Sequence, residues 1–191
     1  MSGWIIWFVG LPGSGKSTLA KAVVDYLQKH LEQEVIYLEM DAQRKKYFPQ
    51  PRYTKEEREQ AYLLFAQEAM ELAREGKGVV MDGAAYKRKF RDYVRNNFSR
   101  FAEIYVKCSL PTAMEREASR PAGKVMADLY QKALIRKRTG KQFAGLGEVI
   151  GVDVDFEENP QAELILVNDH LRVDEAKNQV IQFVRTWLNS K

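Results

Sequence analysis

The chain has 191 residues, of which 45% are hydrophobic and 29% are charged, the proportions of one ordinary globular domain with a sizeable core. Its formal net charge of +4 suits an anionic ligand, but it does not amount to the concentrated basic face that nucleic-acid binding requires. The single cysteine, Cys108, excludes an internal disulfide, so we expect a reducing compartment, the cytoplasm, with Cys108 as a small core residue. The apolar residues 1–10 are far too few to span a bilayer, and no membrane partner is expected.

The predicted elements alternate between strand and helix. Near-continuous apolar runs indicate strands buried on both faces, and apolar residues at spacings of three and four indicate helices with one buried stripe. In chain order the predictions are strand 4–9, helix 17–31, strand 34–39, helix 54–76, strand 78–82, helix 85–97, strand 101–107, strand 162–167 and helix 173–190. This order predicts a parallel five-stranded sheet with right-handed crossovers and helices on both faces, within a single α/β domain.

Residues 119–159 interrupt the alternation, because no clear strand lies among them. The first part of this segment is strongly basic and the second part, "EVIGVDVDFEENP", is acidic. One interpretation is a solvated helical excursion followed by a loop. The other is a lid that brings lysines and arginines over a phosphorylated ligand and excludes water during phosphoryl transfer.

The stretch "GLPGSGKS" satisfies the phosphate-loop pattern G-x-x-x-x-G-K-[ST] in full. Its glycines allow a tight turn in which successive N–H groups point at phosphate oxygens, and the following helix adds its positive dipole end. Lys16 is expected to reach the β and γ phosphates and Ser17 to ligate Mg²⁺. The sequence therefore predicts a MgATP site formed by Gly10, Leu11, Pro12, Gly13, Ser14, Gly15, Lys16, Ser17 and Thr18.

Acidic residues end two of the predicted strands, on the edge of the sheet where the phosphate loop lies. Asp41 follows the second strand and is expected to orient the acceptor hydroxyl, accept its proton or hold a water on Mg²⁺; a helix cap is the structural alternative. Arg44 lies one turn further and is expected to clamp an anionic acceptor. Asp82 ends the third strand and is a weaker candidate for a water-mediated Mg²⁺ contact. The motifs DxxG and NKxD of GTPase switches are absent, which leaves a small kinase.

In this order, "GLPGSGKST", "LEMDAQR", "TKEEREQ", "FAEIYVKCSLPTAMERE", "LYQKA", "QFAGL" and "FEENP" resemble adenylylsulfate (APS) kinase from about Trp4 to Trp187. The resemblance implies a three-layer P-loop kinase with a lid, often dimeric, that transfers the γ-phosphate of MgATP to the 3′-hydroxyl of adenosine 5′-phosphosulfate. It implies that Asp41 is catalytic and that Arg116 belongs to the ATP side. It also implies an acceptor site formed by Asp41, Arg44, Arg58, Tyr86, Lys132 and Phe143, with Phe143 stacking on the adenine.

The sequence departs from the family on the acceptor side. Ala61, Ala84 and Ala144 stand where the family has polar residues. Loss of hydrogen-bonding groups changes which ligand a site accepts. Alternatives therefore stay open: a kinase for another anionic nucleotide-like acceptor, a kinase for a polynucleotide end, or a nucleotide-binding protein without catalysis.

Overall fold

The computed structural model describes residues 3–50, 52, 54–119 and 127–190. Within them, five parallel strands form one sheet in the order β2-β3-β1-β4-β5. The strands are β1 (Trp4–Val9), β2 (Val35–Glu39), β3 (Gly78–Asp82), β4 (Phe101–Lys107) and β5 (Leu164–Val167). The predicted strands are thus confirmed, with β2 and β5 shorter by one and two residues at their starts.

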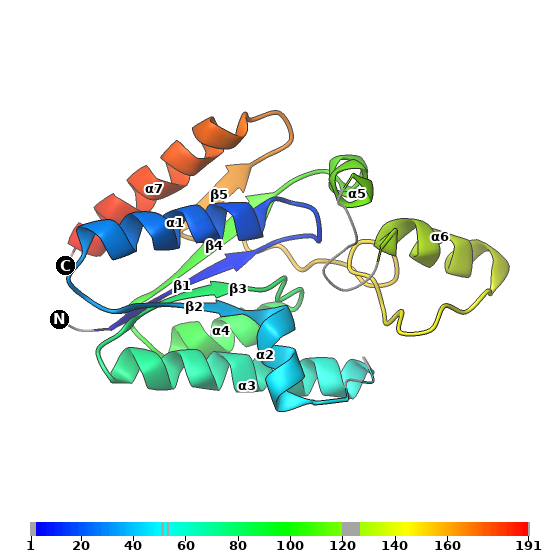
Figure 1. The fold of residues 1–191 in the computed structure, drawn as a ribbon, viewed down its shortest axis with the longest axis horizontal. Helices are drawn as coiled ribbons and strands as arrows, with labels where there is room; N and C mark the ends of the chain where they lie inside the picture. The colour runs from blue at the N-terminus through cyan, green and yellow to red at the C-terminus, as the bar shows by residue number, and fades with distance from the viewer. Residues whose placement is uncertain (1–2, 51, 53, 120–126, 191) are drawn as a thin grey trace.

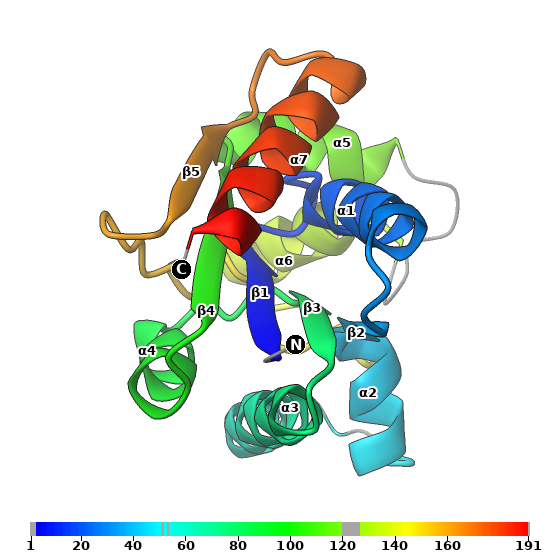
Figure 2. The same cartoon turned by 90° about the vertical axis from the view of Figure 1, so that its left-hand side faces the viewer.

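Helices cover both faces of this sheet (Figures 1 and 2). On one face lie α1 (Lys16–His30) and α7 (Val173–Asn189), and on the other lie α3 (Lys55–Arg74) and α4 (Arg88–Asn97). The short helix α2 (Met40–Tyr47) follows β2 directly and packs beside α3. This is the predicted three-layer α/β arrangement, and it places the phosphate loop and the start of α2 at the carboxyl edge of the sheet.

Two apolar clusters, one on each side of the sheet, form the core. The predicted stripes of α1 and α3 supply them: Leu19, Val23 and Leu27 are buried on one side, and Tyr62, Phe65, Ala66 and Ala69 on the other. The last members of each stripe, Leu31 and Leu72, are only half-buried because they lie at the helix ends. The Thr54 hydroxyl caps α3 by accepting from the backbone N–H of Glu57 at 3.2 Å.

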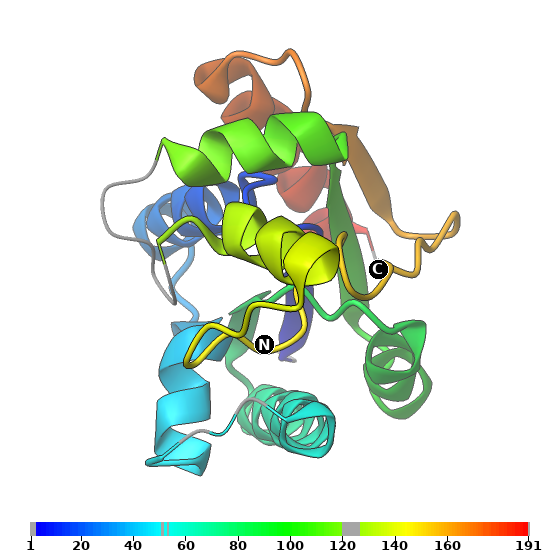
Figure 3. The same cartoon turned by 90° about the vertical axis from the view of Figure 1, so that its right-hand side faces the viewer.

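The segment between β4 and β5 lies across the carboxyl edge of the sheet (Figure 3). It contains α5 (Leu110–Ala118), which the sequence patterns missed, and α6 (Leu129–Thr139), followed by a loop that returns to β5. The predicted insert at 119–159 therefore holds a helix and a loop, and its residues 120–126 lie outside the described residues. Cys108 is buried in a small cluster beneath α6, as expected of a core residue, and burial raises the pKa of its thiol. No helix in the described part of the chain is long and apolar enough to cross a membrane.

Candidate active site

The phosphate loop joins β1 to α1 in the conformation that the glycine pattern predicts. Gly15 is the N-cap of α1 and has a left-handed backbone, with φ at 98°. At Gly13, with φ at 88°, an added Cβ would lie 2.2 Å from the carbonyl oxygen of Ala113. Both positions therefore require glycine. The N–H groups at the start of a helix have no carbonyl partner one turn earlier in the helix, so phosphate oxygens can accept from them.

Side chains from distant parts of the chain hold this loop in place. The Asn168 amide, just after β5, donates to the Ser14 carbonyl at 2.8 Å, and the Tyr130 hydroxyl of α6 donates to the Pro12 carbonyl at 2.7 Å. The Lys16 ammonium donates to the Leu11 carbonyl at 3.3 Å. The loop is thus preformed, and α6 is tied to it through a buried tyrosine.

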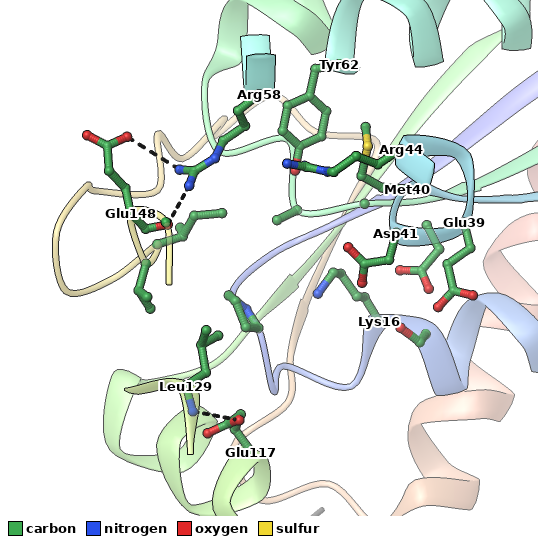
Figure 4. A pocket seen from close by; sticks show the side chains of 18 of the residues that line it. Lys16, Glu39, Met40, Asp41, Arg44, Arg58, Tyr62, Glu117, Leu129 and Glu148 are labelled. Atoms are coloured by element: carbon green, nitrogen blue, oxygen red, sulfur yellow. Dashed lines mark hydrogen bonds and ion pairs between the residues drawn. The ribbon is translucent and has the colours of Figure 1, made fainter. Parts of the chain in front are cut away.

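Three acidic residues at or just after the ends of β2 and β3 line the pocket with Lys16: Glu39, Asp41 and Asp82. Glu39 and Asp41 lie on the same side as Lys16 (Figure 4). Burial raises the pKa of the Asp41 carboxyl, and the positive charges of Lys16 and Arg44 partly offset that rise. The alternative prediction for Asp41, that it caps the following helix, is wrong. Glu39 occupies the N-cap position of α2, and Asp41 lies in the first turn of that helix.

Asp82 and Ser17 are the two residues predicted to hold Mg²⁺, and each has side-chain oxygen. Both line the pocket, and one Asp82 oxygen accepts from the Tyr37 hydroxyl at 2.8 Å, which leaves the other oxygen for a further partner. The described residues contain no cluster of three metal-ligating side chains. Mg²⁺ needs none, since it keeps several waters and takes one or two protein oxygens along with phosphate oxygens. The residues present fit Mg²⁺ bound with ATP.

Arg44 and Arg58 are the cations on the opposite side of the pocket. Both are buried, at 7% and 6% exposed, and they come from α2 and α3. The Arg58 guanidinium donates to the Glu148 carbonyl at 2.7 Å and lies 3.5 Å from the Glu148 carboxylate (Figure 4). Residues 145–150 of the loop after α6 complete the lining above Arg58.

Arg136 of α6 fixes the loop that roofs the pocket. Its guanidinium donates to the carbonyls of Leu146 and Gly147 at 2.8 and 3.0 Å and pairs with Asp153 at 2.6 Å. The Asp153 carboxylate also accepts from the backbone N–H of Val149 at 2.7 Å. Arg136 therefore holds the loop, and the basic pocket-lining residues in the described part of the chain are Lys16, Arg44 and Arg58.

Of the phosphate loop, Pro12, Lys16 and Ser17 line the pocket. Beyond that loop, four residues of the predicted site lie outside the pocket lining. Tyr86 is buried, with the Arg58 guanidinium 5.6 Å from its ring centre, and Arg116 donates to the Asp169 carbonyl at 3.1 Å. Lys132 donates to the Ala127 carbonyl at 2.7 Å, and Phe143 lies under the Lys141 ammonium. The structure therefore brings together the phosphate loop, Asp41, Arg44, Arg58 and Asp82, and it leaves the other four outside the lining.

The three alanine positions have different surroundings. Ala61 is fully buried in the core beneath the pocket, Ala84 lines the pocket, and Ala144 is exposed outside it. Ala84 is thus the position at which a missing polar group changes the described pocket surface directly.

Several lining residues were not predicted, and three of them are Glu39, Tyr62 and Glu117. Glu39 ends β2, so the rule that selected Asp41 also applies to it. Tyr62 belongs to the apolar stripe of α3, and nothing in that pattern shows that its hydroxyl reaches the pocket. Glu117 accepts from the backbone N–H of Leu129 at 3.1 Å, a contact between α5 and α6 that no local pattern predicts.

On one side of the pocket lie a strand, a phosphate loop and a helix. They face an aspartate and two buried arginines, and a loop roofs the pocket. This arrangement defines a P-loop kinase. Residues 2–167 match the adenylylsulphate kinase family model. The chain therefore belongs to the adenylylsulphate kinase family, and it is a kinase.

Known proteins support the family assignment, both in sequence and in fold. A probable adenylyl-sulfate kinase of Archaeoglobus fulgidus is 30% identical over 166 residues, 87% of this chain and 96% of that protein. The cytidine diphosphoramidate kinase of Campylobacter jejuni is 29% identical over 86% of both chains. The APS kinase of Mycobacterium tuberculosis, solved with AMPPNP and APS, matches this fold with a TM-score of 0.76. The two chains are 22% identical, and the match covers 96% of this chain and 98% of that one.

Proposed function

We propose that this kinase transfers the γ-phosphate of MgATP to the 3′-hydroxyl of adenosine 5′-phosphosulfate, giving the 3′-phosphorylated product. One observation carries the proposal: the preformed phosphate loop faces Asp41, Arg44 and Arg58 across a single pocket. That arrangement supplies a place for the triphosphate and, opposite it, a carboxylate and two cations for an anionic acceptor with a hydroxyl group.

Each side chain has a role that its chemistry permits. The loop N–H groups and Lys16 neutralise the transferred phosphoryl group. Ser17 and Asp82 would hold Mg²⁺, which would supply further positive charge. Asp41 orients the acceptor hydroxyl and accepts its proton. Arg44 and Arg58 bind the acceptor's anionic group, and the roofing loop excludes water.

The remaining predicted residues act at the edge of this site. Arg116 belongs to the ATP side, and Tyr86, Lys132 and Phe143 to the acceptor side, with Phe143 stacking on the adenine. The protein would act in the cytoplasm, and the family resemblance makes a homodimer the expected assembly.

A second candidate acceptor is another anionic nucleotide-like compound. The observation that favours it is Ala84, which gives the pocket wall a methyl group where the family places a serine hydroxyl. The relative from Campylobacter jejuni bears the name of a kinase with a different nucleotide acceptor. Both candidates use the same phosphate loop and Asp41.

A coupled assay for ADP release, run with MgATP and each acceptor in turn, tests the proposal. We expect APS to stimulate ADP release well above background hydrolysis. Stimulation by a different nucleotide alone would transfer the assignment to the second candidate. Stimulation by oligonucleotide ends, with steep salt dependence, would make it a polynucleotide kinase. MgATP binding without turnover on any acceptor would indicate a nucleotide-binding protein without catalysis.

A further inference from the structure

Tyr62 lines the acceptor side of the pocket, and the proposed function gives it no role. It lies on α3 one turn after Arg58, so the two side chains share a face of the helix. In Figure 4 the ring lies between the two arginines, and its hydroxyl end points toward the Arg44 guanidinium. The side chain is only 3% exposed, so the part that is accessible faces the pocket.

Neighbouring aromatic rings fix the position of this hydroxyl. The Tyr62 ring stacks on Phe90 with centres 5.2 Å apart, and it contacts the rings of Tyr86 and Trp7 at 6.4 Å each. A ring held on several sides keeps one orientation without ligand. Binding a ligand through the hydroxyl would therefore cost little conformational entropy.

The surroundings of the hydroxyl make it a hydrogen-bond donor toward the pocket. Burial raises the pKa of Tyr62, while Arg44, a backbone hydrogen bond from Ala85 and Arg58 act in the opposite direction. The hydroxyl thus keeps its proton near neutral pH. The groups that Arg44, Arg58 and the Ala85 backbone present to it are hydrogen-bond donors, so none of them accepts this proton. The Asp41 carboxylate also acts on Tyr62 but lies toward Lys16 (Figure 4). An oxygen atom of a bound anion would be a suitable partner for the Tyr62 proton.

The turn that carries Ala85 is held in an uncommon conformation. Ala85 has a φ of 42°, in the left-handed region that residues with a side chain rarely adopt. Such strain persists where the surrounding structure fixes it, and it is frequent at ligand sites. The turn after β3 therefore shapes this side of the pocket together with Tyr62.

We propose that Tyr62 is an acceptor-binding residue, whose hydroxyl donates a hydrogen bond to a phosphate or sulfate oxygen of the acceptor held by Arg44 and Arg58. This inference rests on the proposed function and deepens it. It supplies a hydroxyl on the side of the pocket where Ala84 has none. The acceptor class it specifies is a small nucleotide with an anionic group at the 5′ side.

Equilibrium binding to the Tyr62→Phe variant tests the inference. Calorimetric titrations with APS and with CDP are made on protein saturated with Mg²⁺ and AMPPNP, so that the phosphate loop is occupied. For whichever probe the wild type binds, we expect Tyr62→Phe to raise the Kd about tenfold, the loss of one charge-assisted hydrogen bond. Its affinity for AMPPNP should not change, which shows that the variant is folded.

Tyr105→Phe is the matched control. Tyr105 is also buried in this cluster, but its hydroxyl donates to Glu158 at 3.0 Å and does not line the pocket.

Adenosine, which lacks the anionic group, should bind wild type and Tyr62→Phe equally. An unchanged Kd for the bound probe in Tyr62→Phe would overturn the inference while the proposed function stands. Binding of neither probe by the wild type would overturn the proposed function, and this inference with it.

Discussion

Asp41 carries a carboxyl group that is only partly exposed to water. Burial disfavours its ionised form, so its pKa is raised, while Lys16 and Arg44 stabilise that form. As pH rises through the ordinary carboxyl range, the raised pKa costs the folded protein stability, because the unfolded chain ionises first. Such a carboxylate is better matched to proton transfer near neutral pH than an exposed one.

The first prediction concerns this carboxylate. Asp41→Asn should lower kcat by about 10²- to 10⁴-fold, because the amide cannot accept the hydroxyl proton, with MgATP affinity little changed. In the wild type, activity should fall as the pH drops through the raised pKa, which places the acidic limb above the usual carboxyl range. Steady-state kinetics against pH checks both points. Wild-type turnover in the variant would refute the assigned role.

A second buried charge has a structural role. Arg91 and Glu103 are both fully buried and pair at 2.5 Å, and Glu103 also accepts from the Asn159 amide at 2.8 Å. Glu103→Gln should destabilise the protein by about 3–5 kcal/mol, because Arg91 is left buried without its counter-charge. Urea unfolding measures this. Glu75→Gln, which breaks the surface pair with Lys77, is the control and should have a much smaller effect, because solvent screens that pair. Equal effects would contradict the argument.

At the scale of elements, α6 is coupled to both halves of the site. Tyr130 contacts the phosphate loop, and Arg136 holds the roofing loop. One of the two interpretations of this segment from the sequence was a lid whose basic residues face a phosphorylated ligand. Arg136 instead donates to backbone carbonyls of its own segment, because the carbonyls of the loop that follows α6 need donors.

The third prediction follows from that contact. Arg136→Met should release residues 146–153, raise the acceptor KM about tenfold and increase ATP hydrolysis relative to transfer, since water then enters the pocket. Arg138→Met is the control, because Arg138 lies exposed near the end of the same helix. Product analysis that separates phosphate from phosphorylated acceptor measures the ratio. An unchanged ratio in Arg136→Met would show that the loop does not depend on this contact.

The strength of local signals explains which elements were predictable. The strands and the helices α1, α3, α4 and α7 carry apolar periodicity over many residues, and burial in a single sheet reinforces it. The helix α5 was missed because it is short and buries few apolar residues. Tyr62 was predicted only as a core residue, since the direction of its hydroxyl depends on the turn at residues 83–86, which is distant in sequence.

At the scale of the whole molecule, the parallel sheet brings the site together. β1 lies between β3 and β4, so the phosphate loop emerges where neighbouring connections leave in opposite directions, the usual ligand position in such sheets. The parallel sheet could be predicted from the alternation of strands and helices, and so could the position of Asp41 and Asp82 at its carboxyl edge, whereas the strand order was not predicted. The identity of the acceptor could not, because it depends on contacts among α2, α3, the turn after β3 and the roofing loop.

The central claim is transfer of the γ-phosphate of ATP to a small nucleotide acceptor in this pocket. The most direct measurement uses ATP labelled at the γ-phosphate with MgCl₂ and APS, followed by separation of the products and location of the label. We predict label on the 3′-oxygen of the acceptor with wild-type protein and almost none with Asp41→Asn. Label found only in free phosphate, with APS and with every other nucleotide acceptor tried, would contradict the account.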